Sequence, residues 1–242
     1  MDAIRTVELT KRYKELVALD GLCLSVKKGE LFSLLGVNGA GKTTAIKLLT
    51  CLSTPSAGEA FVCGYSVKSQ SEDVKRRIGV SPQETAVAPN LTVKENLEFL
   101  CGIRGLTAKQ TQQTVAELTE RFALSSVLKR KAGKLSGGFQ RRVSIAMALV
   151  GEPEVLFLDE PTLALDVLAR RDLWNVIRAL KGKTTVVLTT HSMEEAETLS
   201  DCVGILKEGR LLEVGTPTKL KEKTGTDKLE DAFVSIAKEE RT

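Results

Sequence analysis

Apolar and polar positions follow three different patterns along this chain of 242 residues. Residues 4–9 and 22–26 alternate apolar and polar side chains, as half-buried strands do. Residues 31–36 (LFSLLG) form a short, nearly continuous apolar run that is typical of a buried parallel strand, and helical sequence follows it. Residues 53–59 (STPSAGE) then predict a loop, and residues 60–67 (AFVCGYSV) predict one further strand.

Residues 84–150 contain helix signals and no strand signal. Two capping boxes, each a threonine with Glu or Gln three residues later, begin at Thr92 and Thr107. After the second of them, apolar side chains recur at helical spacing, at Val115, Leu118 and Phe122. We therefore predict that residues 84–150 form an inserted helical subdomain.

Strand and helix patterns alternate again after residue 150. Residues 154–160 (EVLFLDE) and 184–190 (TTVVLTT) have the composition of buried strands, and residues 166–180 between them predict a crossover helix. This alternation indicates an α/β fold with a mainly parallel sheet and helices on both faces. We expect a single domain, residues 1–242, with its core in 1–83 and 151–220 and a partly exposed, mixed-charge tail in 221–242.

The composition excludes several classes of protein. Lys and Arg number 35 and Asp and Glu 31, so the net charge of +4 is too balanced to suggest a nucleic-acid partner. The five cysteines are scattered and form no CxxC pair, as expected for reduced thiols in the cytosol. The longest apolar run, IAMALV, is far shorter than the roughly 20 residues of a membrane span, and MDAIRTVELT at the start lacks the apolar stretch of a signal peptide.

Residues 36–44 (GVNGAGKTT) satisfy the phosphate-loop pattern between a predicted strand and a predicted helix. Glycines leave room for backbone N–H groups to reach phosphate oxygens, Lys42 reaches the β- and γ-phosphates, and the Thr43 hydroxyl is suited to Mg²⁺. A plain glycine turn is the alternative, and the strand–loop–helix context disfavours it. The residues expected to bind the nucleotide here are Gly36, Asn38, Gly39, Gly41, Lys42, Thr43 and Thr44.

An acid pair, Asp159 and Glu160, ends the predicted buried strand VLFLD. Open α/β sheets bind ligands at the carboxyl ends of their strands. Asp159 is suited to the Mg²⁺ shell, and Glu160 to orienting and deprotonating an attacking water. Such a pair also caps helices, but the phosphate loop upstream favours the catalytic interpretation.

Three single residues are weaker candidates. His191, the only histidine, closes the strand TTVVLTT before a helix capped by Ser192 and Glu195; it has either a structural role or donates a hydrogen bond to a γ-phosphate oxygen. Gln83 follows the predicted strand RIGVSP, and a glutamine in such a loop is ordinarily unremarkable. Tyr13 either stacks on adenine or packs against its neighbours.

A second glycine-rich helix start occurs about a hundred residues after the first. Residues 135–142 (LSGGFQRR) place Ser136 at a helix N-cap, with Gly137 and Gly138 behind it. Such a start is an anion site. One nucleotide needs one phosphate cradle, so the pattern alone does not explain the second.

Taken together, these motifs resemble the nucleotide-binding subunit of an ATP-binding cassette (ABC) transporter over nearly the whole chain. The resemblance rests on Tyr13 as the adenine-stacking aromatic, on 36–44 as Walker A and on Gln83 as the Q-loop. It continues with LSGG as the signature, VLFLDE as Walker B, LALD (163–166) as the D-loop and His191 as the switch histidine. The family has glycine at the position of Ala164 in most relatives, so this chain departs there.

The resemblance implies a phosphate-loop NTPase core with a mainly parallel sheet, an antiparallel N-terminal part and the helical insert. It implies ATP and Mg²⁺ as ligands. The implied catalytic residues are Glu160, His191 and Gln83, and the implied metal site is Thr43, Gln83 and Asp159. It also implies a head-to-tail pair of subunits, expected to be a homodimer, in which Ser136, Gly137, Gly138 and Asp166 of one copy cover the nucleotide of the other.

The implied partners are polytopic membrane permeases, which would hold this chain in the cytoplasm at the inner face of the plasma membrane. LTVKENLEF, the pair Arg141–Arg142 and KLEDAFVSI are similar to drug-, ion- and polysaccharide-exporting ATPases. The alternative is a soluble ABC protein in translation, DNA repair or cofactor assembly, but the chain has one cassette and no heptad run. A GTPase or small-molecule kinase is disfavoured because no N-K-x-D motif occurs.

Overall fold

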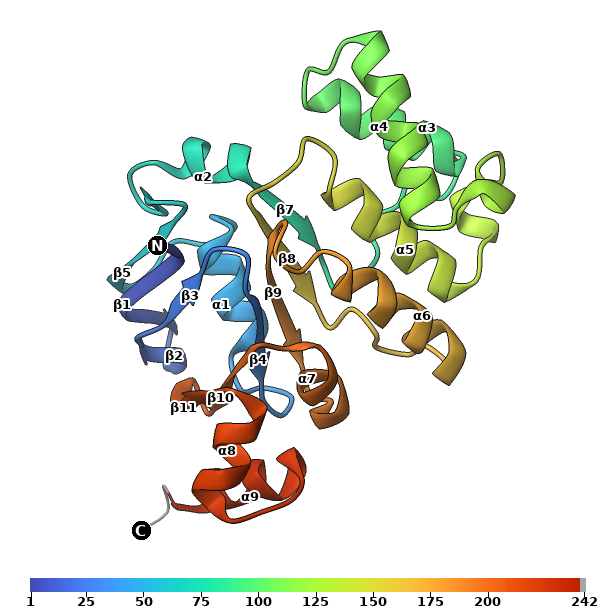
Figure 1. Ribbon diagram of the computed structural model, residues 1–242. Coiled ribbons are helices and arrows are strands. Elements are labelled where there is room, and N and C mark those ends of the chain that lie inside the picture. Colours follow the sequence, from blue (N-terminus) through green and yellow to red (C-terminus); the bar gives the residue numbers. More distant parts are fainter. Residues whose placement is uncertain (240–242) are drawn as a thin grey trace.

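The computed structural model describes residues 1–239, which form two sheets flanked by helices (Figure 1). The larger sheet has the strand order β11-β10-β4-β9-β8-β7. Its strands are β4 (Leu31–Leu35), β7 (Ile78–Ser81), β8 (Val155–Asp159), β9 (Thr185–Thr190), β10 (Cys202–Lys207) and β11 (Arg210–Gly215). All its pairs are parallel except β10 with β11, so the predicted α/β fold with a mainly parallel sheet is confirmed.

The three central strands bring the predicted motifs to one edge. Every residue of β4, β8 and β9 is buried, in agreement with their apolar sequences. The parallel register pairs Leu35 with Thr190 and Asp159 with Thr189. The segments that follow these strands therefore start side by side, and they lead into α1 (Lys42–Leu49), α6 (Val167–Arg178) and α7 (Met193–Leu199).

The smaller sheet is antiparallel, as expected for the N-terminal part. It consists of β1 (Asp2–Tyr13), β2 (Leu16–Leu22), β3 (Ser25–Lys27), β5 (Ala57–Val62) and β6 (Tyr65–Ser66). The single strand predicted for residues 60–67 is wrong: β5 and β6 are a hairpin that turns at Cys63 (φ 51°) and Gly64 (φ 83°). The predicted loop 53–59 is also shorter, because β5 begins at Ala57.

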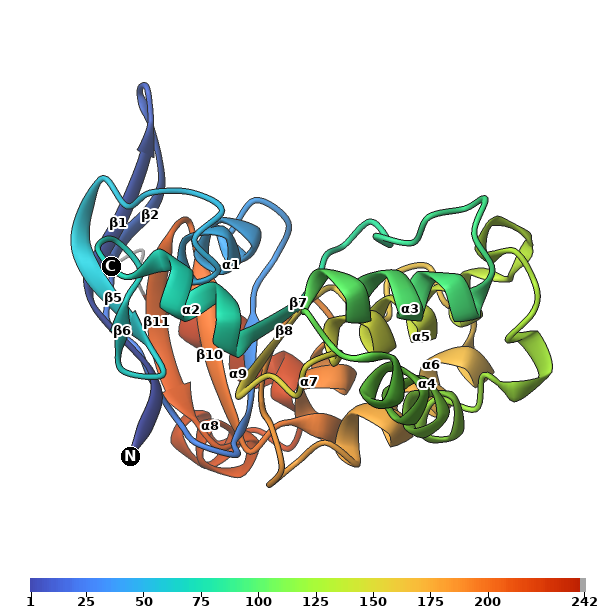
Figure 2. The same cartoon turned by 90° about the horizontal axis from the view of Figure 1, so that it is seen from above.

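A helical lobe lies to one side of the sheets (Figure 2). It contains α3 (Val93–Ile103), α4 (Ala108–Arg121) and α5 (Gly137–Ala148), while α2 (Ser71–Arg77) belongs to the sheet side. Residues 84–150 contain no strand, only an isolated bridge between Thr92 and Lys131. Both capping boxes are present, and the apolar residues predicted for the inner face, Val115, Leu118 and Phe122, are buried.

The C-terminal segment is more ordered than the sequence predicts. Residues after β11 form α8 (Pro217–Thr224) and α9 (Leu229–Glu239). Their inner face packs against Leu35, Val203 and Ile205 through Leu220, Leu229, Ala232, Phe233 and Ile236. The interpretation of residues 221–242 as a tail is therefore corrected as far as residue 239; the last three residues lie outside the described part of the chain.

Among residues 1–239, the longest apolar helical stretch falls short of what a membrane crossing requires.

Candidate functional site

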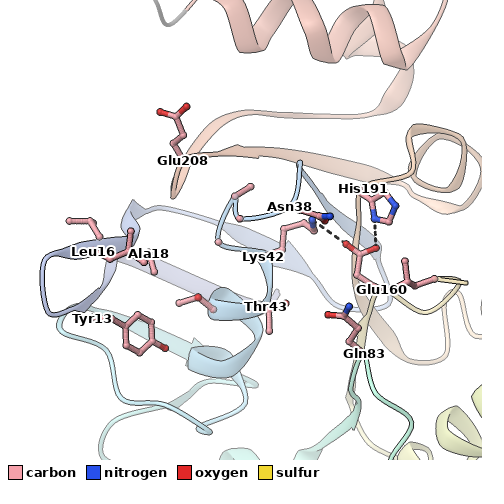
Figure 3. A pocket seen from close by; sticks show the side chains of 16 residues that line it. Tyr13, Leu16, Ala18, Asn38, Lys42, Thr43, Gln83, Glu160, His191 and Glu208 are labelled. Atoms are coloured by element: carbon pink, nitrogen blue, oxygen red, sulfur yellow. Dashed lines mark hydrogen bonds and ion pairs between the residues drawn. The ribbon is translucent and has the colours of Figure 1, made fainter.

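A cavity of about 650 Å³ opens at the carboxyl edge of the larger sheet (Figure 3). Ten sequence-predicted residues line it: Tyr13, Asn38, Gly39, Gly41, Lys42, Thr43, Thr44, Gln83, Glu160 and His191. Six more residues line it: Ala40 and Leu163 belong to the predicted Walker A and D-loop motifs, while Leu16, Val17, Ala18 and Glu208 were not predicted as site residues. Segments that are far apart in the sequence thus converge on one concave site, as expected for a small-molecule pocket.

The phosphate loop leads from β4 into α1 without a side-chain cap. Gly41 is the N-cap of α1 in a left-handed conformation (φ 105°), and no side chain bonds to the first turn. No acidic residue lies in that turn. The free N–H groups and the positive end of the helix dipole therefore favour an anion in the cavity.

Lys42 is the first residue of α1 and is 6% exposed. Its ammonium donates to the carbonyl of Gly36 at 2.7 Å and to that of Val37 at 3.3 Å. It also pairs with Glu160 Oε1 at 3.1 Å. Gly36 itself does not line the cavity, so its contribution is this carbonyl, which holds the lysine side chain across the loop.

Glu160 stands at the centre of a three-residue chain of polar contacts. One carboxylate oxygen meets Lys42 and the other lies 2.8 Å from His191 Nδ1. Glu160 is buried, whereas the His191 side chain is 45% exposed. The backbone of Glu160 has φ 48°, a left-handed conformation that non-glycine residues adopt at a cost of order 1–3 kcal/mol and mostly at functional sites.

Asp159 lies behind the cavity wall and is 4% exposed. Its Oδ1 accepts hydrogen bonds from the Thr43 hydroxyl at 3.3 Å and from the Thr189 hydroxyl. Hydroxyl and carboxylate oxygens are ligands that Mg²⁺ prefers. The Gln83 side chain faces the same region (Figure 3). This donor set fits a magnesium ion that also has substrate phosphate and water as ligands.

Tyr13 ends β1 at the rim of the cavity and is 43% exposed. The Lys11 ammonium lies 5.0 Å from the centre of its ring. An aromatic ring that is largely open at the rim suits stacking on a base better than it suits core packing.

The residues of the second glycine-rich motif lie outside this cavity. Ser136 is the N-cap of α5, but its side chain makes no capping hydrogen bond, and both it and Gly137 are exposed. Asp166 is also outside and caps α6, where its carboxylate accepts from the Ala169 N–H at 2.9 Å. No acidic residue lies in the first turn of α5, so this end too favours an anion.

Comparison with known proteins identifies the family of this chain. Residues 19–163 match the sequence profile of the family described as ABC transporter. The Nod factor export ATP-binding protein I of Burkholderia thailandensis is 43% identical over 226 residues, which cover 92% of this chain and 74% of that protein. The chain belongs to the ABC transporter family.

Two further matches describe the extent of the similarity. The probable multidrug ABC transporter ATP-binding protein YbhF of Escherichia coli (strain K12) is 38% identical over 239 residues, or 96% of this chain, which spans 41% of YbhF. A solved dimeric ATP-binding cassette, in a post-hydrolysis state with ADP and Pi, is 28% identical with a TM-score of 0.80. That match covers 88% of this chain and 98% of the solved one, and it agrees with the ABC ATPase fold.

In this ABC cassette, the helix cap expected after His191 is only half correct. The Ser192 hydroxyl accepts from the Glu195 N–H at 3.3 Å. The Glu195 carboxyl does not return to the cap; its Oε1 accepts from the Thr162 hydroxyl at 2.8 Å and from Trp174 Nε1 at 3.0 Å. Burial raises the pKa of Glu195 above its ordinary value of 4.5, and hydrogen bonds from Thr190, Thr162 and Trp174 oppose that rise.

The sequence context of Arg141 predicts no individual role, although Arg141 belongs to the arginine pair that is similar to exporting ATPases. Arg141 is 5% exposed, and its guanidinium contacts the turn that carries Gln83. Burial lowers the pKa of this guanidinium. Arg141 is the fifth residue of α5, and an arginine in a helix is ordinarily exposed, so only the structure reveals these contacts.

Proposed function

We propose that this ABC cassette binds and hydrolyses ATP as the energising subunit of a transporter, with each nucleotide held between two copies of the chain. The observation that carries this proposal is the contrast between one complete cavity and a second anion-binding helix end that faces outward. The relatives named above are export and multidrug ATP-binding proteins, which supports a role in export.

Lys42 supplies the first part of the proposed mechanism. Its ammonium is already aimed across the loop by the Gly36 carbonyl at 2.7 Å. A triphosphate carries more charge than Glu160 does, so the phosphates compete for Lys42. Glu160 then loses its ion-pair partner and keeps His191, which lies 2.8 Å away.

Glu160 would then act as the base that orients and deprotonates the attacking water. His191 holds the carboxylate through Nδ1, which leaves Nε2 for a γ-phosphate oxygen. Thr43, Asp159 and Gln83 would hold Mg²⁺, which neutralises phosphate charge when it is bound. Tyr13 would stack on the adenine ring, and Asn38, Gly39, Gly41 and Thr44 would contribute contacts around the phosphates.

The signature end of α5 would complete the site of a second copy. Ser136, Gly137 and Gly138 present an uncapped helix N-terminus, and Asp166 lies on the neighbouring loop. Exposed apolar side chains lie beside them, at Leu163, Val167 and Leu168. Covering these residues on dimerisation would remove apolar surface from water, which favours association.

The helical lobe offers a surface for the membrane partner. Phe99 and Ile103 are 58% and 64% exposed and lie four residues apart on α3, hence on one face. We expect cysteines placed within residues 84–104 to crosslink to a permease and ATP to change the yield. Crosslinks confined to residues 217–239 would contradict this docking surface.

The test of the proposed function is Glu160→Gln. Removing the base should slow hydrolysis about 10²–10⁴-fold while the phosphate contacts persist. The variant should therefore accumulate as an ATP-bound dimer in size-exclusion chromatography. Glu154→Gln, at an exposed residue immediately before the same strand, is the matched control and should keep wild-type turnover. Wild-type turnover in Glu160→Gln would remove Glu160 from this role.

A further inference from the structure

Arg141 is a buried cation whose hydrogen-bond partners are two backbone carbonyls. It belongs to α5, and its two terminal nitrogens donate to the carbonyl of Pro82 at 2.6 Å and to that of Gln83. None of the carboxylates in residues 1–239 forms a direct ion pair with it, although the charge of Asp159 favours its protonated form. A buried guanidinium without a direct ion pair is costly, so its hydrogen bonds to the two carbonyls have to offset that cost.

Two further contacts attach α5 to the strand before Gln83. The hydroxyls of Ser144 and Ser81 lie 2.9 Å apart in a buried hydrogen bond. A Cβ on Gly79 would lie 1.9 Å from the Ala148 carbonyl oxygen, so only glycine allows this approach of helix and strand. Three contacts along α5 therefore hold the segment from β7 to Gln83. They are made by Arg141, Ser144 and Ala148.

The chain on the other side of Gln83 is anchored to a different helix. Asn96 of α3 is 1% exposed, accepts from the Ala88 N–H at 2.8 Å and donates to the Ala88 carbonyl at 3.2 Å. Residues 84–87 thus connect a segment fixed to α5 with a segment fixed to α3. Gln83 belongs to the first of these, although residues 84–150 follow it directly in the sequence.

We propose that Arg141 is a positioning residue for Gln83, which makes the Gln83 side chain in the cavity follow the helix that carries Ser136–Gly138. This inference rests on the proposed function. Because Ser136–Gly138 would contact the partner's nucleotide while Gln83 faces the chain's own, Arg141 would connect the two composite sites of the dimer. The connection is one side chain spanning α5 and the turn after β7.

A double-mutant cycle with Arg141→Gln and Gln83→Ala tests this link. Displacing Gln83 should lower kcat about 10- to 100-fold in either single variant. The KM for ATP should stay within about twofold, because the phosphate loop is untouched. Both variants should need more Mg²⁺ for half-maximal turnover. The double variant should be no slower than Gln83→Ala, since Arg141 acts through Gln83.

Ser144→Ala is the matched control, because it removes a bond between α5 and β7 without touching the carbonyl of Gln83. It should lower Tm but leave the Mg²⁺ dependence unchanged, and Arg141→Lys should restore part of the lost kcat. Effects of Arg141→Gln and Gln83→Ala that multiply in the double variant would overturn the inference.

A readout that needs no turnover separates this inference from the proposed function. Hydrogen exchange in the peptide that contains residues 81–87 should be faster in Arg141→Gln than in wild type and in Ser144→Ala. Unchanged exchange in Arg141→Gln would contradict the positioning role. A wild-type protein that hydrolyses no ATP would instead contradict the proposed function, while the exchange contrast would still stand.

Discussion

The N-termini of α1 and α5 are chemically alike and differ in their surroundings. Both helices follow glycine-containing segments, and both lack a side-chain cap and an acid in the first turn. Around α1, the same chain provides a lysine, a glutamate and a histidine in contact. Around α5, Ser136 and Gly137 are exposed and lie outside the cavity.

This difference indicates which end is complete within one chain. An anion at α1 meets a positive side chain, a buried acid and a metal-type oxygen set, all from the same chain. The α5 end offers an anion its N–H groups, the Ser136 hydroxyl and the helix dipole. Under the proposed function, this end would contribute recognition and the chemistry would come from the second copy.

The largest difference in ATP affinity should appear between variants at the N-terminus of α1 and variants at the N-terminus of α5. Lys42→Ala removes a charged hydrogen-bond donor to phosphate and should weaken ATP binding about 10- to 100-fold, with loss of turnover. Lys47→Ala, an exposed lysine on the same helix, is the control. Calorimetry measures the affinity, and equal affinities for Lys42→Ala and wild type would contradict the phosphate-loop assignment.

Gly138→Asp should abolish turnover yet leave ATP binding to the single chain near the wild-type value, because α5 lies outside the cavity. The added carboxylate repels a γ-phosphate. A Cβ at Gly138 would lie 3.1 Å from the Ala169 Cβ, so Gly138→Ala is needed to separate crowding from charge. Turnover that falls equally in both variants would show that crowding, and not charge, causes the loss.

Substitution of Glu195 should have an intermediate, pH-dependent effect on stability. This residue of α7 accepts a hydrogen bond from Thr162 in the loop after Glu160. Its pKa is raised by burial, so the folded chain keeps a proton that the unfolded chain loses near pH 4.5. The unfolded state binds fewer protons above that pH, so the free energy of unfolding falls as pH rises through this window. A glutamine at this position cannot ionise, so Glu195→Gln should remove this pH dependence of the free energy of unfolding.

The measurement is the difference in Tm between Glu195→Gln and wild type at pH 5 and pH 8. The Tm of the variant minus that of wild type should be higher at pH 8 than at pH 5. All other titrating groups are common to both proteins, so this change reports on Glu195. A Tm difference that is the same at both pH values would show that Glu195 is ionised in the folded protein.

The smallest effect concerns Ala164, which has φ 61° on the exposed loop beside the α5 end. Glycine adopts this conformation without steric cost, but it adds entropy to the unfolded chain. Ala164→Gly should therefore change stability by less than about 1 kcal/mol, with a Tm rise of roughly 3 °C at most. A clear fall in Tm would show that the alanine methyl packs in a way that offsets its strain.

Sequence alone was sufficient to locate motifs that are encoded within a few residues. Both capping boxes are present, and residues of the phosphate loop line the same cavity as Glu160, while the roles of these cavity residues stay predictions. The hairpin at Cys63 was missed because a non-glycine residue adopts positive φ there. The packing of α8 and α9 was missed because numerous charges obscure the apolar spacing of Leu229, Phe233 and Ile236.

Arg141 and Glu195 could not be identified from local pattern. The partners of Arg141 lie 58 and 59 residues away, and those of Glu195 lie 21 and 33 residues away. Both are charged residue types that are ordinarily exposed. Only the tertiary fold shows that each is buried against the segment that carries a candidate catalytic residue.

The central claim, that one nucleotide is held by two chains, is tested most directly by mixing inactive variants. Lys42→Ala damages a chain's own cavity and Gly138→Asp damages its α5 end, so each homodimer should be inactive. A heterodimer of the two contains one doubly damaged site and one intact site. We expect phosphate release from tandem-purified heterodimers at up to about half the wild-type rate per dimer, if the sites act independently. Verified heterodimers that release no phosphate above either homodimer would contradict the account, because both halves of the site would then belong to the same chain.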